Sequence, residues 1–107
     1  MSPFNDDTDR LYVLTRRDLP WSTRCVQAAH AATALTHVQH ERFDGLWGTH
    51  GPAFVFYSVP DEPELRVWRD RLGKDAVPFE EPDLGDQLTA LAYCGPKRPE
   101  FETLRLL

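Results

Sequence analysis

The stretch "RLYVLTRRDLPWSTRCVQAAHAATAL" (residues 10–35) decides the fold that we predict for this chain of 107 residues. Its opening segment is rich in aromatic and β-branched side chains, which favour a buried strand. Pro20 disfavours a continuation of that strand. Ser22 or Thr23 can cap a helix, which we expect to run to about Glu41. The stretch therefore predicts one strand that is followed directly by one helix.

Two neighbouring faces of this predicted helix differ in chemistry. One face is an apolar row that we expect to pack on the sheet. Its members are Cys25, Ala28, Ala32, Leu35 and Val38. The other face carries the polar heads of Arg24, Gln27 and His30 in one column at i, i+3 spacing. The surrounding alanines leave room for a substrate end beside Gln27 and His30; alternatively, they only shorten the distance between helix and sheet, and His30 bonds a strand carbonyl.

The middle of the chain repeats the pattern of strand and helix. A glycine-rich connector ends the first helix, and "AFVFYSV" (53–59) reads as a second strand. Pro60 or Asp61 opens a second helix, and Gly73 ends it. The inner face of this helix consists of Leu65, Trp68 and Leu72. A crossover of this kind places the two strands parallel to each other.

The remaining third of the chain predicts a hairpin and a short helix. Residues 77–80 form a short strand, 81–87 a turn and 88–94 a buried strand. Apolar residues at positions 101, 104 and 107 predict a short terminal helix that starts near Pro99. The fold class is therefore α/β, a three-layer α/β/α domain with a mixed sheet of about four strands. Ligands of such sheets bind along the edge where strand ends and helix starts gather.

Composition limits the classes of protein to which the chain can belong. Hydrophobic residues make up 41% and charged residues 27%, which indicates one globular domain over residues 10–107 behind a flexible acidic leader, residues 1–9. The leader is polar where a secretory signal is apolar, so we expect a cytoplasmic protein. Cys25 and Cys94 are too few and too far apart for a disulfide framework, and we expect both to be buried, reduced thiols.

The net charge of −5 argues against binding of nucleic acid by overall attraction. Charges sum to zero over residues 1–40, however, and this part of the chain contains Arg16, Arg17 and Arg24. These arginines are candidate phosphate contacts, because a planar guanidinium suits phosphate oxygens. Trp21 lies in the loop just before the expected site and can stack on a terminal base.

Two motifs resemble the type-II peptidyl-tRNA hydrolase family. The strand "YVLTRRDL" before a helix with "VQAAHAA" is similar to that family's strand, which ends in Arg-x-Asp-Leu, and its helix with Ala-Gln-x-x-His-Ala. The segment "EEPDLGDQLTALAYCGP" is similar to its Asp-x-Gly loop and its Thr-led strand, which ends in Gly-Pro. The resemblance covers residues 10–96 and implies a hydrolase that cleaves the ester between a peptidyl group and the 3′ end of tRNA.

The resemblance also implies a site, which consists of Gln27, His30, Asp83 and Thr89. Its chemistry suits ester hydrolysis, because an amide can hold an oxyanion or a water and an imidazole can accept a proton. Asp83 has an alternative role as a turn residue, and Thr89 as an ordinary strand residue. The acidic turn around Asp83 repels phosphate, so we expect the tRNA to contact the arginines instead.

The chain departs from the family at two places. Thr23 occupies the position of the family's lysine, with Arg24 beside it, and the loop from Asp83 to Thr89 is shortened. Two alternatives therefore stay open: an inactive module that binds a tRNA end, a nucleotide or a protein, and a hydrolase of another acylated substrate in which Arg24 replaces the lysine. No cofactor is implied, and a homodimer is possible.

A metal site has little support in the sequence. His37 and His40 lie one helical turn apart, and His50 follows in the connector, but no acid or cysteine stands at matching spacing. We therefore expect no metal.

Overall fold

The computed structural model describes residues 9–40 and 53–107. The leader up to residue 8, the end of the first helix at Glu41 and the connector with Trp47 and His50 lie outside the described residues. In the ranges that are described, no helix has the length and apolar character that a membrane span requires.

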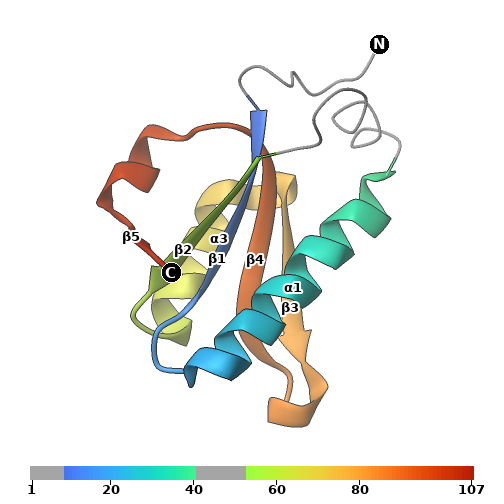
Figure 1. The fold of residues 1–107 in the computed structure, drawn as a ribbon, viewed down its shortest axis with the longest axis vertical. Helices are drawn as coiled ribbons and strands as arrows, with labels where there is room; N and C mark the ends of the chain where they lie inside the picture. Colours follow the sequence, from blue (N-terminus) through green and yellow to red (C-terminus); the bar gives the residue numbers. More distant parts are fainter. Residues whose placement is uncertain (1–8, 41–52) are drawn as a thin grey trace.

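Strand β1 (Asp9–Arg16) lies at the centre of a five-stranded mixed sheet with the order β3-β4-β1-β2-β5 (Figure 1). It pairs in parallel with β2 (Phe54–Val59), as the crossover predicts. On its other side it pairs antiparallel with β4 (Gln87–Pro96), which in turn pairs antiparallel with β3 (Ala76–Glu81). The α/β class and the order of the main elements are thereby confirmed.

The end of the chain matches the prediction in part. A short 3₁₀ helix, η4 (Pro99–Thr103), starts at Pro99 as expected, but it leads into a fifth strand, β5 (Arg105–Leu106), which pairs antiparallel with β2 and was not predicted. Phe101 is almost completely buried in the core, and the backbone N–H of Leu107 donates to the carbonyl of Phe56 at 2.9 Å. The backbone N–H of Leu104 still donates to the carbonyl of Phe101 at 3.0 Å, and after this helical hydrogen bond the chain pairs with the edge of β2.

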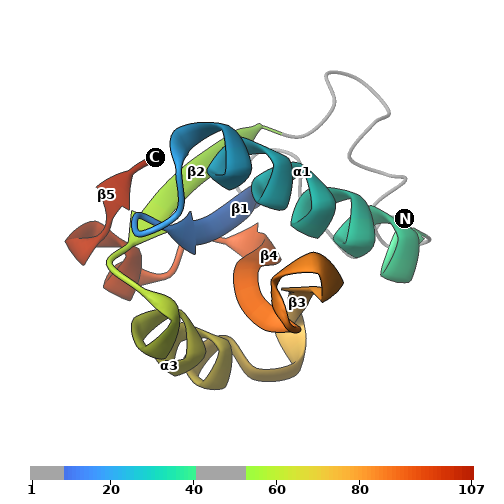
Figure 2. The ribbon, with the colours of Figure 1, turned by 90° about the horizontal axis from the view of Figure 1, so that it is seen from below.

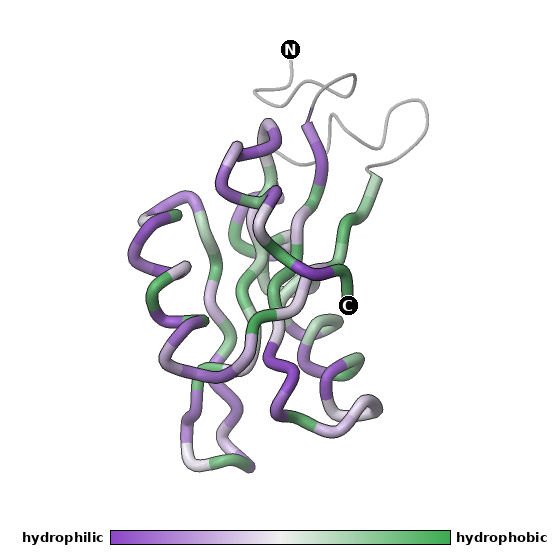
Figure 3. Tube along the Cα trace, turned by 90° about the vertical axis from the view of Figure 1, so that its left-hand side faces the viewer, coloured by the Kyte–Doolittle hydropathy of each residue, from purple (hydrophilic) through white to green (hydrophobic). Residues whose placement is uncertain are grey.

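Helix α3 (Glu62–Leu72) follows its sequence signals closely. The side chain of Asp61 caps the helix by accepting a hydrogen bond from the backbone N–H of Glu64 at 3.1 Å. Gly73 ends it with φ of +61°, a left-handed conformation that favours glycine. The predicted inner face is buried, and the rest of the helix is largely hydrophilic (Figure 3).

Helix α1 (Trp21–Val38) begins and faces differently from the prediction. Pro20 is its N-cap residue, and neither Ser22 nor Thr23 caps it with a side chain. The buried positions are Gln27, Ala28, Ala31 and Leu35. Cys25 is exposed and Val38 is 65% exposed, so the expected burial of these two residues is wrong, whereas Cys94 is buried as expected. The helix is rotated toward the side that carries Gln27.

The two helices pack on opposite faces of the sheet, as an end-on view shows (Figure 2). On the α1 face the buried cluster contains small side chains, among them Ala28, Ala31, Ala90, Ala92 and Cys94. On the α3 face the cluster is aromatic and contains Tyr12, Tyr57, Trp68, Tyr93 and Phe101. Alternate residues of β1 supply both clusters, as period-two side-chain alternation in a strand requires.

Candidate functional site

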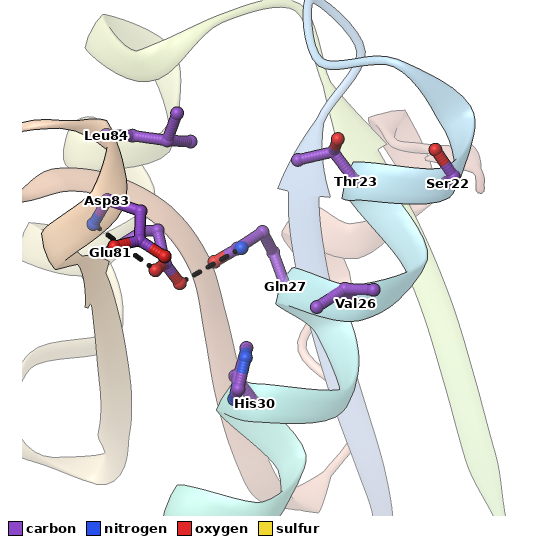
Figure 4. Close-up of a pocket in the computed structure, with 8 residues that line it drawn as sticks. All are labelled: Ser22, Thr23, Val26, Gln27, His30, Glu81, Asp83 and Leu84. Atoms are coloured by element: carbon purple, nitrogen blue, oxygen red, sulfur yellow. Dashed lines mark hydrogen bonds between the residues drawn. The ribbon is translucent and has the colours of Figure 1, made fainter.

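A cavity of about 350 Å³ lies between the first turns of α1 and the turn that joins β3 to β4 (Figure 4). Helix α1 lines it with Ser22, Thr23, Val26, Gln27 and His30. The other wall consists of Glu81, Asp83 and Leu84. The structure thus brings three of the four expected site residues, Gln27, His30 and Asp83, to one cavity.

The fourth residue, Thr89, lies behind Gln27 and does not line the cavity. Its hydroxyl donates a hydrogen bond of 2.6 Å to the Gln27 Oε1 atom, and Gln27 Nε2 donates to Glu81 Oε2 at 3.1 Å. The other carboxylate oxygen of Glu81 accepts from the backbone N–H of Asp83 at 3.4 Å. A polar chain therefore runs from the interior of the sheet, through Gln27, to the cavity wall.

This polar chain fixes the orientation of the Gln27 amide. Thr89 is fully buried and Gln27 is 4% exposed, so each polar group needs a partner. A hydroxyl that donates to Oε1 and a carboxylate that accepts from Nε2 allow only one amide orientation. The second N–H of Nε2 makes no hydrogen bond within the described residues and can donate to a ligand.

His30 is exposed on the cavity wall and lies flat against the ring of Phe79. Their ring centroids are 4.6 Å apart, and the interplanar angle is 9°. Stacking of this kind limits rotation of the imidazole, while its exposed edge can exchange protons with water. The aromatic stack thus replaces the strand carbonyl that we considered as a structural partner for His30.

Glu81 is a residue of this cavity that the resemblance does not assign to the site. By sequence it belongs to the turn 81–87, whereas in the structure its carboxylate accepts a hydrogen bond from the Gln27 amide. The sequence signal that could have identified Glu81 is the alternation of β3 side chains between the two faces of the sheet. Val77 and Phe79 pack against the α1 face of the sheet, so residue 81 belongs to the same face.

Arg16 is committed to structural contacts and is 6% exposed. Its guanidinium makes a two-pronged contact with Asp18 at 2.9 and 2.8 Å and also donates to the side chain of Gln87 and the carbonyl of Leu88. The hydrogen bond from Arg16 lowers the pKa of the Asp18 carboxyl. Arg16 therefore ties the end of β1 to the start of β4 and does not line the cavity.

Arg17, Arg24 and Trp21 also lie outside the cavity lining. Arg24 donates to the carbonyls of Arg17 and Leu19 at 3.0 and 3.1 Å, and its guanidinium carbon lies 5.4 Å from the centroid of the Trp21 ring. Trp21 is 58% exposed. These contacts direct the Arg24 guanidinium toward the loop. Arg24 therefore does not replace, in the cavity, the lysine that the family has at the position of Thr23.

The ionisable groups that line the cavity are the imidazole of His30 and two carboxylates, Glu81 and Asp83. Among the residues that the structure describes, no lysine or arginine lines it. Among residues 9–40 and 53–107, no group of three or more His, Cys, Asp or Glu side chains could hold a metal ion. The chemistry within reach is proton transfer and hydrogen bonding.

No family model and no curated protein sequence matches the chain. The resemblance of the two motifs and the geometry of the cavity are therefore the features that bear on function.

Proposed function

We propose that this protein is a type-II peptidyl-tRNA hydrolase-like enzyme of the cytoplasm, which needs neither metal nor cofactor. It cleaves the ester between a peptidyl or acyl group and the 3′ end of tRNA. The observation that carries the proposal is the convergence of Gln27, His30 and Asp83, from two distant motifs, on one cavity. The presence of one helix on each face of the sheet supports the three-layer α/β/α arrangement that the resemblance implies.

In the proposed reaction, a water held between His30 and Asp83 attacks the ester carbonyl. His30 accepts the proton of this water, and the carbonyl oxygen becomes an oxyanion that the second N–H of Gln27 stabilises. The ester bond then breaks, and the 3′ oxygen of the tRNA leaves with the proton from His30. Thr89 and Glu81 act as positioning residues, because both hold the Gln27 amide.

The acceptor end of the tRNA approaches from the loop between β1 and α1. The cavity itself is acidic, so phosphates stay outside it and only the ester enters. Trp21, with Arg24 stacked against it, forms an exposed platform for the terminal base. Arg17 lies in the same loop and contributes positive charge, while Arg16 holds the loop in place.

The test is release of a labelled N-acetylated amino acid from tRNA by the pure protein. We expect His30→Ala to slow release by about 100-fold or more, the range of general acid–base catalysis. His37→Ala, an exposed histidine of the same helix, is the matched control and should leave the rate unchanged. Equal release by the parent and His30→Ala, or no release by either, ends the catalytic proposal.

A second candidate function is a binding module that has the fold but no hydrolysis. It is favoured by one observation, Thr23 on the cavity wall where the family has its lysine. Thr23→Lys separates the two functions. If this variant hydrolyses the ester and the parent does not, the parent is a binding module; if the parent already hydrolyses it, Thr23 is compatible with catalysis.

A further inference from the structure

A second cavity, of about 220 Å³, lies where β2 ends, beside α3 and β5. Arg17, Arg71 and Arg105 line it from three separate elements, namely the loop after β1, helix α3 and strand β5. Of the described residues in its lining, Glu64 alone is acidic. Within the described ranges, this cavity shares no lining residue with the acidic cavity described above.

The contacts of these arginines hold two of them in place without neutralising them. Arg17 donates from one nitrogen to both the carbonyl and the hydroxyl oxygen of Ser58, at 2.9 and 3.2 Å. Arg71 lies over the ring of Trp68, with its guanidinium carbon 5.1 Å from the centroid. None of the ion pairs among the described residues includes Arg17, Arg71 or Arg105.

The β2–β5 register brings Arg105 close to the residue that holds Arg17. Arg105 pairs directly with Ser58, and residues that face each other across antiparallel strands have side chains on the same face of the sheet. Ser58 is 1% exposed, and both its carbonyl oxygen and its hydroxyl oxygen accept from Arg17. Ser58 therefore anchors the Arg17 guanidinium beside the strand that carries Arg105.

We propose that this cavity binds a phosphoryl group, either as inorganic phosphate or as a phosphate ester. Three guanidinium groups and one carboxylate give the lining a charge of +2 in a protein whose net charge is −5. A phosphate monoester carries about −1.5 to −2 at pH 7 and offers three acceptor oxygens, which matches this charge. A carboxylate is satisfied by one guanidinium fork, whereas donors from three elements suit a tetrahedral anion.

The size of the cavity limits what else the ligand carries. Drug-sized ligands occupy roughly 300–1,000 Å³, and this cavity is smaller. It holds a single phosphoryl group together with a short part of the molecule that carries it. Binding here does not rest on the proposed hydrolysis, because the ligand is not a reactant.

The test is calorimetric titration of the full chain with inorganic phosphate at low ionic strength. We expect saturable binding that Arg105→Gln and Arg71→Gln each weaken by about tenfold. Arg69→Gln is the matched control on the same helix, since it removes the same charge outside the cavity, and should bind like the parent. Glu64→Gln should bind more tightly, because the lining then carries +3. This gain tests the site even if an arginine variant fails to fold.

Competition identifies the source of the phosphoryl group. A nucleoside 5′-monophosphate that displaces phosphate supports a small phosphate ester, and displacement by an RNA oligomer without terminal phosphates supports a nucleic-acid backbone. Saturable binding that neither competitor displaces identifies inorganic phosphate itself as the ligand. The proposal is overturned by absence of saturable binding or by equal weakening in Arg69→Gln, either of which would indicate an adventitious ion only.

Discussion

The two faces of the sheet differ in the side chains that pack on them. Under α1 lie alanines from both the helix and β4, and under α3 lies a cluster of aromatic rings. On the small-residue face, the buried amide of Gln27 accepts a hydrogen bond of 2.6 Å from the buried hydroxyl of Thr89. The alanines therefore have a specific role. Their small side chains let α1 lie close enough to the sheet for the buried Gln27 amide to bond Thr89.

The largest effect is expected on the aromatic face, from Phe101→Ala. The ring of Phe101 lies 4.9 Å from that of Tyr12 and 5.5 Å from those of Tyr57 and Trp68, so its removal leaves a large void. We expect a loss of about 3–5 kcal/mol in the free energy of unfolding, measured by urea denaturation. Phe54→Ala, at a ring that is 45% exposed, should cost far less. Similar losses for both variants would contradict the contrast between core and surface.

On the small-residue face, an increase in volume should be harmful. Ala31→Leu places a larger side chain under α1 at a fully buried position, and we expect it to destabilise the fold by about 2 kcal/mol. It should also displace Gln27 and slow ester release. The control is Ala29→Leu, at an exposed position of the same helix. If Ala31→Leu were tolerated like Ala29→Leu, close packing of α1 would not be the reason for alanine.

The polar chain is tested by Thr89→Val, which keeps the shape of the side chain and removes its donor. The buried Oε1 atom of Gln27 then loses its partner, so we expect a loss of about 1.5 kcal/mol in unfolding free energy. Thr89→Ser, which keeps the hydroxyl, should recover the hydrogen bond. A Thr89→Val protein as stable and as active as the parent would show that the 2.6 Å hydrogen bond does not position Gln27.

The smallest effect is expected at the end of β1, where Arg16 links β1 to β4. The pKa of Asp18 is lower folded than unfolded, so its contribution is present above the unfolded pKa and is lost as pH falls through the folded value. Asp18 is 42% exposed, so this contribution is about 1 kcal/mol at most. Asp18→Asn should therefore reduce stability at pH 7 and flatten its decline in acid. An unchanged pH profile of unfolding would contradict the assignment.

Much of the fold follows from local signals in the sequence. Helix α3 has a capping aspartate, a terminal glycine and a regular apolar stripe, and all three act as their chemistry predicts. Strand β5 could not be predicted, because two residues are too few for a periodic pattern. Its pairing depends on the edge of β2, which lies far away in the sequence.

The rotation of α1 shows where local reasoning about the site ends. By polarity, Gln27 belongs on a solvent face, and Cys25 in the core. The helix buries Gln27 instead because Thr89 and Glu81 satisfy its amide, and these partners lie 62 and 54 residues away in the chain. The motifs predicted Gln27, His30 and Asp83 as neighbours in one site. Glu81 was identified from its hydrogen bond with Gln27 in the structure.

Gln27 and Glu81 are expected to act as one unit at the cavity, because the Glu81 carboxylate accepts a hydrogen bond from the Gln27 amide. The most direct measurement is a double-mutant cycle on kcat/KM for ester release, with Gln27→Ala, Glu81→Ala and the double variant. Each single substitution should lower kcat/KM by about 100-fold, and the double variant should lose no more than the worse single one. Losses that multiply, or variants that hydrolyse the ester like the parent, would contradict the claim.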